Sequence, residues 1–134
     1  HAEATMSVRI LQGDTVESVK HYLESIMPCD VQVKATFAED PKPAGSVESE
    51  AYHLMSETIY DIFGKETLIV PNLMLGASDS RNYAKVSDNV FRFSGRLKTE
   101  QWGEAHQVDE RMPTEHLGVP VSFFKAFLKK YNEK

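Results

Sequence analysis

The stretch from residue 38 to residue 48 limits what this chain can fold into more than any other feature. Its sequence is Ala-Glu-Asp-Pro-Lys-Pro-Ala-Gly-Ser-Val-Glu. Proline removes a backbone donor and glycine frees the backbone, so neither a helix nor a central strand is expected to cross it. We predict a hinge linker here, with one folded segment over residues 1–37 and another over residues 49–134.

Residues 1–37 combine two periodicities. Apolar side chains first recur at every second position, which is typical of a strand with one buried face; they are Ala4, Met6, Val8 and Ile10. Asp14 followed by Glu17 indicates a capping box, and an apolar stripe at helical spacing continues up to Pro28. Residues 31–37 alternate again, so this segment is predicted to be strand–helix–strand.

Residues 49–134 are predicted to begin and end with a helix. Helical periodicity covers residues 49–63, before Gly64, and residues 119–131. The expected core faces of the two helices are Tyr52, Met55, Ile59 and Ile62, and Phe123, Phe124, Phe127, Leu128 and Tyr131. Between the helices, short strands are expected at residues 67–70, 73–75 and 89–93, a short helix up to residue 86, and a long loop at residues 94–113. Because strands alternate with helices, the predicted class is α/β.

Composition excludes several functions. The chain has 134 residues, 41% of them hydrophobic, and a net charge of −5 without a basic patch, so no nucleic-acid partner is expected. No apolar run approaches the roughly 20 residues of a membrane span, and no signal peptide is expected. A single cysteine, Cys29, fits a reducing compartment, so we predict a cytoplasmic location. The chain opens at His1 directly in a strand pattern, from which we expect an excised piece of a longer protein.

The first group of candidate functional residues is Ser78-Asp79-Ser80-Arg81, which follows a predicted strand. Small residues let a backbone approach a ligand closely, and a guanidinium can bind a carboxylate through two parallel hydrogen bonds. An arginine that simply faces solvent is the other interpretation, and the motif alone does not exclude it.

The second group is His106-Gln107-Val108-Asp109-Glu110-Arg111, in the predicted long loop. A neutral imidazole binds zinc well, and a nearby carboxylate can orient the ring. A solvated surface histidine is the other interpretation. The remaining histidines have no ligand spacing, so this chain by itself is not expected to form a complete zinc site, and no Gly-x-Ser-x-Gly or phosphate-loop motif is present.

Taken together, the two groups are similar to a known pattern. Ser-Asp-Ser-Arg, a helix, Val-Phe-Arg-Phe and then His-x-x-Asp-Glu-Arg resemble the C-terminal third of the carboxypeptidase S-like and aminoacylase-like dizinc metallopeptidases. That family typically shows Gly-x-Thr-Asp-Ser-Arg and then His-Gly-x-Asn-Glu or His-Asp-x-Asp-Glu. Ser78 stands here for the usual threonine, and Gln107 stands where relatives often have glycine.

The resemblance implies a fold and a set of roles. Residues 1–37 resemble the end of a ferredoxin-like lid domain, and residues 49–134 the C-terminal part of the zinc-peptidase catalytic domain. By the same resemblance His106 is a metal ligand and Glu110 supports it, while the substrate-binding residues are Arg9, Asp79, Ser80 and Arg81. Two zinc ions per complete site are implied, with at most one ligand from this chain. The family's other ligands and its general-base glutamate are absent, so no catalytic residue is assigned.

The predicted function is therefore that of a part of a zinc-dependent amidohydrolase or carboxypeptidase. Metal-activated water would cleave amide bonds of small peptides or N-acyl amino acids, and the isolated chain is expected to be inactive. One alternative is a non-catalytic module that forms a homodimer through an open sheet edge of the lid segment. A weaker one is a carboxylate-binding protein without metal.

Overall fold

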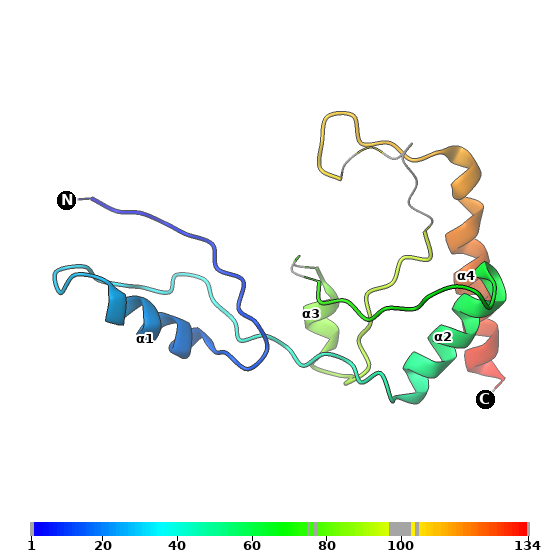
Figure 1. Cartoon of the computed structure of the whole chain (residues 1–134), viewed down its shortest axis with the longest axis horizontal. Helices are drawn as coiled ribbons and strands as arrows, with labels where there is room; N and C mark the ends of the chain where they lie inside the picture. Colours follow the sequence, from blue (N-terminus) through cyan, green and yellow to red (C-terminus); the bar gives the residue numbers. More distant parts are fainter. Residues whose placement is uncertain (1, 75, 77, 97–102, 104, 134) are drawn as a thin grey trace. The chain divides into compact units, whose positions relative to one another are not determined.

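The computed structural model describes residues 2–74, 76, 78–96, 103 and 105–133, and these residues are helical where they are regular (Figure 1). Along the chain the elements are α1 (Val16–Ile26), α2 (Glu50–Phe63), α3 (Ser80–Tyr83), the 3-10 helix η1 (Thr114–His116) and α4 (Gly118–Asn132). The predicted helices at residues 49–63 and 119–131 are confirmed to within a residue. Residues 97–102 of the predicted long loop, with 104, lie outside the described residues.

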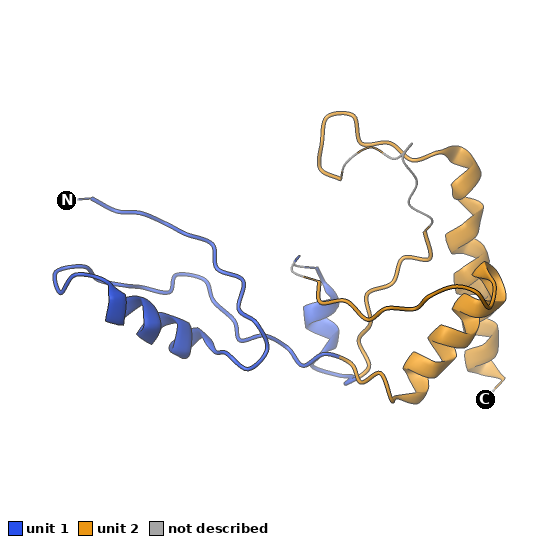
Figure 2. Ribbon diagram, viewed as in Figure 1, with its two compact units in different colours: residues 1–44, 75–88 blue, residues 45–74, 89–134 orange. Residues whose placement is uncertain are grey.

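The chain divides into two compact units, coloured separately in Figure 2. The first comprises residues 1–44 and 75–88, and the second residues 45–74 and 89–134. The first change of unit falls inside the predicted linker, and the segment that carries α3 belongs to the first unit. The domain boundaries inferred from the sequence stay a prediction.

Helix α1 of the first unit begins with a reciprocal cap. The Thr15 side chain accepts from the Ser18 N–H at 3.0 Å, and the Ser18 side chain accepts from the Thr15 N–H at 2.9 Å. The capping box predicted between Asp14 and Glu17 is therefore wrong by one position, because a serine can close the box as well as a glutamate. The helix ends before Pro28, as predicted.

Two residues of the predicted linker form hydrogen bonds at or just before the N-terminus of α1. Asp40 Oδ1 accepts from the Val16 N–H at 2.8 Å, and Gln12 Nε2 donates to the Lys42 carbonyl at 3.1 Å. The first four N–H groups of a helix have no partner within it, and a carboxylate there is also favoured by the helix dipole. Two prolines thus do not keep residues 38–44 from packing locally.

The second unit contains a hydrophobic core between α2 and α4. Leu54 and Ile59 of α2 are each 4% exposed, and Phe123 of α4 is 2% exposed. Phe123 lies 4.8 Å from the Phe93 ring centroid, and Gly95 leaves room beside it, since an added Cβ would stand 3.2 Å from the Phe123 Cβ. Burying a phenylalanine contributes about 1.5–3 kcal/mol.

The predicted core faces of these helices are correct only in part. Leu54 and Thr58 are buried in α2 although neither was expected there. In α4 only Phe123 is buried, while Phe124, Leu128 and Tyr131 are exposed. On both helices the apolar residues can be grouped into several neighbouring stripes. The position of the helix packed against them determines which stripe is buried.

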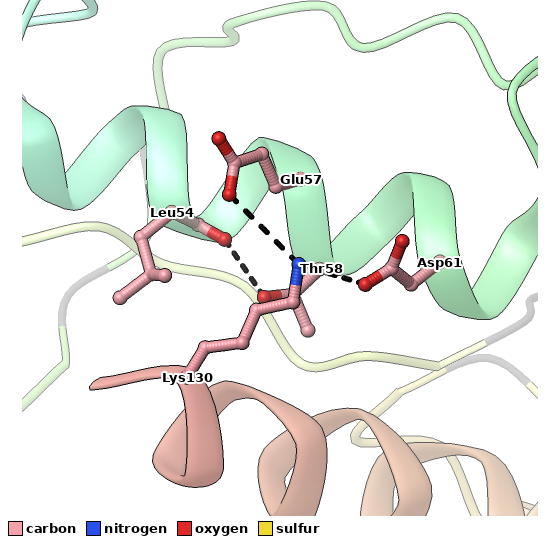
Figure 3. A network of polar contacts seen from close by, with 5 residues as sticks. All are labelled: Leu54, Glu57, Thr58, Asp61 and Lys130. Atoms are coloured by element: carbon pink, nitrogen blue, oxygen red, sulfur yellow. Dashed lines mark hydrogen bonds and ion pairs between the residues drawn. The ribbon is translucent and has the colours of Figure 1, made fainter. Parts of the chain in front are cut away.

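A polar contact joins the same two helices next to this core (Figure 3). Lys130 Nζ lies 2.7 Å from Asp61 Oδ2 and 3.8 Å from Glu57 Oε2, and the Thr58 hydroxyl donates to the Leu54 carbonyl at 2.7 Å. The hydrogen bond to Asp61 raises the pKa of Lys130 above its usual 10.5, with a further contribution from the charges of Asp61 and Glu57 and against a desolvation effect. Both partners of Lys130 are well exposed, so the ion pair contributes little to stability.

No strand is formed by the residues that the structure describes. The segments predicted as strands at residues 3–10, 31–37, 67–70 and 89–93 lack the ladder of backbone hydrogen bonds that defines a strand. Alternation of apolar and polar side chains shows only that one face of a segment is apolar. A ladder of backbone hydrogen bonds also requires a neighbouring strand. The helical part of the α/β prediction is confirmed, and the sheet part is not borne out by these residues.

Candidate functional site

The Ser78–Arg81 turn lies in the first unit and leads into α3. The hydroxyl groups of Ser78 and Ser80 lie 2.7 Å apart, and the Arg81 N–H donates to the Ser78 carbonyl at 3.3 Å. Asp79 caps the helix by its backbone position only, without a side-chain hydrogen bond to the helix. The turn also contains the exposed residues Asp79 and Arg81, which lie two positions apart in the sequence.

Phe37 stands against the guanidinium of Arg81 within the same unit. The Arg81 Cζ is 6.0 Å from the centroid of the Phe37 ring, and the residue Phe37 is 80% exposed. At this distance the ring contributes a weak cation–π attraction, about 0.5–1 kcal/mol at an exposed position. Phe37 was predicted only as a strand residue, and nothing in its local sequence pointed to Arg81.

Arg9 belongs to the first unit as well and is exposed. Its predicted convergence with Arg81 on one substrate stays a prediction. Its segment was expected to be a strand whose sheet would fix the side chain's direction, and no such sheet is formed by the described residues.

His106 lies in the second unit, on a tightly closed loop. The loop is closed at its base by a hydrogen bond from the Gly103 N–H to the Arg111 carbonyl at 3.1 Å. Glu110 Oε2 accepts from the His106 N–H at 3.1 Å, and His106 has a φ of 63°. The imidazole is exposed, so it is accessible to a ligand.

The described residues do not supply the rest of a metal site. Among them, no three histidine, cysteine, aspartate or glutamate side chains lie where they could share a metal ion. The sequence predicted at most one ligand from this chain, and that number stays a prediction. Gly103, which the sequence argument missed, is the residue that lets the two arms of the loop approach each other.

The chain is 32% identical over 129 residues to the N-fatty-acyl-amino acid synthase/hydrolase PM20D1.1 of Danio rerio, covering 92% of this chain and 25% of that protein. It is 32% identical over 130 residues to the probable carboxypeptidase S-like 1 of Dictyostelium discoideum, covering 95% of this chain and 27% of that protein. The PM20D1 protein of Mus musculus is 26% identical over 132 residues, covering 96% of this chain and 26% of that protein.

No family model matches the chain, and no solved structure matches it. The sequence matches are nevertheless to proteins of the aminoacylase- and carboxypeptidase-like peptidase family, which confirms the resemblance that the motifs predicted. The chain spans about a quarter of the length of the curated relatives it matches, at their C-terminal end. The relatives are hydrolases by name, which supports the amidohydrolase class.

In the described part of the chain, no helix has both the length and the apolar character needed to cross a bilayer. The predicted cytoplasmic location and homodimer stay predictions.

Proposed function

We propose that this chain supplies the C-terminal part of a zinc-dependent amidohydrolase that cleaves N-acyl amino acids or small peptides. Likeness over more than nine-tenths of the chain to proteins named as an N-fatty-acyl-amino acid synthase/hydrolase and a carboxypeptidase carries this proposal. The order of the two motifs also supports it. Arg81, which is suited to bind a carboxylate, precedes His106, which is suited to bind a metal, as in the family pattern that the motifs resemble.

Within this proposal each side chain has a distinct task. Arg81 would bind the carboxylate of the substrate through its guanidinium, which is exposed and ready to donate. Arg9 would bind the same carboxylate, and Asp79 and Ser80 would shape the turn that presents Arg81. A substrate without the carboxylate would leave these donors unmatched, so the site would select for it.

His106 would hold one of two zinc ions. A neutral imidazole is a common zinc donor, and an exposed one on a closed loop can meet further ligands from elsewhere. One ligand does not retain zinc, so the other ligands and the general base would come from polypeptide outside these 134 residues. Bound zinc would polarise the amide carbonyl and lower the pKa of a water molecule.

The test is metal content together with activity in the complete enzyme. His106→Ala is expected to lose zinc and nearly all hydrolysis of an N-acyl amino acid. His21→Ala is the matched control, because His21 is also exposed but lies on α1, and it is expected to retain both. Zinc content and turnover that survive in His106→Ala would reject His106 as a ligand.

Arg81→Ala separates substrate recognition from chemistry. We expect a raised KM for substrates with a free carboxylate, and no change for the corresponding methyl esters or amides. An equal loss for both kinds of substrate would show that Arg81 does not recognise the carboxylate.

The alternative of a non-catalytic dimerisation module predicts self-association without any dependence on metal. It depends on an open sheet edge in residues 1–37 and stays a prediction. The likeness to proteins that are named as hydrolases favours the hydrolase. Sedimentation of the protein with and without a chelator distinguishes the two.

A further inference from the structure

His106 has a backbone conformation that needs support. Its φ of 63° lies in the left-handed region, and among the described residues it is the only one other than glycine with a positive φ. L-amino acids with a Cβ adopt this region rarely, and such conformations persist where the surrounding structure imposes them. The conformation at residue 106 decides in which direction the imidazole leaves the loop.

Two contacts impose this conformation. The Glu110 carboxylate accepts from the His106 N–H at 3.1 Å, and the Glu110 N–H donates to the Gln107 carbonyl at 3.2 Å. Glu110 is therefore anchored to the turn at both its backbone and its side chain, and its carboxylate is directed at the backbone of residue 106.

The base of the loop tolerates only glycine at position 103. A Cβ added there would lie 2.8 Å from the Arg111 N and 3.0 Å from the Glu110 Cα, and still closer to the Asp109 carbonyl oxygen. These are backbone atoms and cannot move aside as a flexible side chain can. Gly103 thus permits the close approach that brings Glu110 within reach of His106.

From this geometry we propose that Glu110 is a positioning residue that acts on His106 through the backbone N–H rather than through the imidazole ring. This deepens the proposed function and rests on it, since positioning matters only if the ring holds a metal. Among the described residues the ring has no hydrogen-bond or ion-pair partner, whereas its backbone N–H has Glu110.

The two modes of action predict different results for Glu110→Gln. A carboxylate that orients a metal-bound imidazole also raises its basicity, so its loss weakens metal binding. A carboxylate that only accepts a backbone N–H can be replaced by the amide oxygen of glutamine, which accepts the same hydrogen bond. Backbone action therefore predicts that glutamine substitutes for glutamate and alanine does not.

The experiment compares zinc affinity of the complete enzyme, measured by competition with a chelator, among the parent protein, Glu110→Gln and Glu110→Ala. We expect Glu110→Gln to match the parent and Glu110→Ala to bind zinc about 10- to 100-fold more weakly, the range seen when a supporting partner is lost. An equal loss in both variants, or full affinity in Glu110→Ala, overturns the proposal.

Amide hydrogen exchange at residue 106 is a second measurement of the positioning role of Glu110, and it does not require bound metal. The His106 N–H is expected to exchange slowly in the parent and in Glu110→Gln and rapidly in Glu110→Ala. If His106→Ala keeps its zinc, the proposed ligand role fails, yet the exchange rates still decide whether Glu110 holds the backbone. If the 106 amide exchanges equally fast in all three proteins, the positioning proposal fails whatever the metal does.

Two glycine variants provide a matched control for the closed loop. Gly103→Ala is expected to speed exchange at residue 106 and weaken zinc binding as Glu110→Ala does. Gly118→Ala is expected to change neither, because no atom lies within 4 Å of a Cβ added there. A Gly103→Ala protein with the parent's exchange and affinity would contradict a role for the loop's closed base.

Discussion

Helices α1 and α2 have similar N-terminal caps but differ in how many of their side chains are buried. Each has a hydroxyl N-cap, Thr15 or Ser49, whose oxygen accepts a backbone N–H three residues on. Each has an acidic residue in its first turn and an amphipathic sequence. Yet α2 buries three side chains against the rest of its unit, and α1 buries none among the described residues.

The difference comes from what the rest of each unit offers. The second unit has α4, which packs against α2 and carries the buried Phe123. In the first unit the described segments around α1 leave large apolar side chains exposed, among them Met6, Val8, Val31 and Phe37. An amphipathic stripe makes burial favourable, but another element must supply the apolar surface.

The largest expected effect is on the core of the second unit. Phe123→Ala should lower the free energy of unfolding by about 3–5 kcal/mol, because it removes a buried ring and leaves a cavity. Phe124→Ala is the control, since Phe124 is 44% exposed and should cost much less. Denaturant unfolding with amide exchange would show protection lost in α2 and α4 and unchanged in α1; loss in α1 as well would mean that the two units are coupled.

The second-largest expected effect is the loss of a helix N-cap, which should destabilise α1 and α2 equally. Thr15→Ala and Ser49→Ala each remove a cap hydrogen bond, of 3.0 and 3.2 Å, and should each cost about 1 kcal/mol of helix stability. Exchange rates of the first-turn amides in α1 and α2 measure this. A much larger change in α2 than in α1 would show that cap strength depends on the core and not on local chemistry alone.

The smallest effect is that of the ion pair between α2 and α4. Because the folded-state pKa of Lys130 is raised, its contribution is present below pH 10.5 and is lost as pH rises through the raised pKa. We expect about 0.2–1 kcal/mol, since the groups are partly exposed. Asp61→Asn should lose this contribution below pH 10.5 and show a smaller further loss of stability at alkaline pH. Lys129→Met is the control, because the ion-pair partner of Lys129 is Glu133, four residues on, and not a residue of α2.

The ends of α1, α2 and α4 were predictable from the sequence to within about a residue, because they depend on nearby residues. The short helix predicted to reach residue 86 is wrong at its end, since α3 stops at Tyr83. Gly64, with a φ of 95°, ends α2 where a residue with a side chain would be strained. Pro28 and the hydroxyl caps act over three or four residues in the same way. The error of one position at the start of α1 came from overlooking Ser18, which was visible in the sequence.

The candidate site was predicted by a different route. His106 and Arg81 were singled out because their motifs resemble a family. The relatives confirm that resemblance, and the roles of the two residues stay predictions. The roles of Gly103 and Phe37 were not, because each depends on a segment that is distant in sequence or on a backbone approach that no pattern records.

By itself the sequence determined where α1, α2 and α4 begin and end, because caps, glycines and prolines act on their immediate neighbours. Tertiary structure decided which apolar stripe of α2 and α4 is buried, and that the alternating segments form no ladder among the described residues. It also decided that residue 106 takes a left-handed conformation, in which its backbone N–H donates to the Glu110 carboxylate. Burial and strand pairing require a second surface, and only the folded chain brings that surface into place.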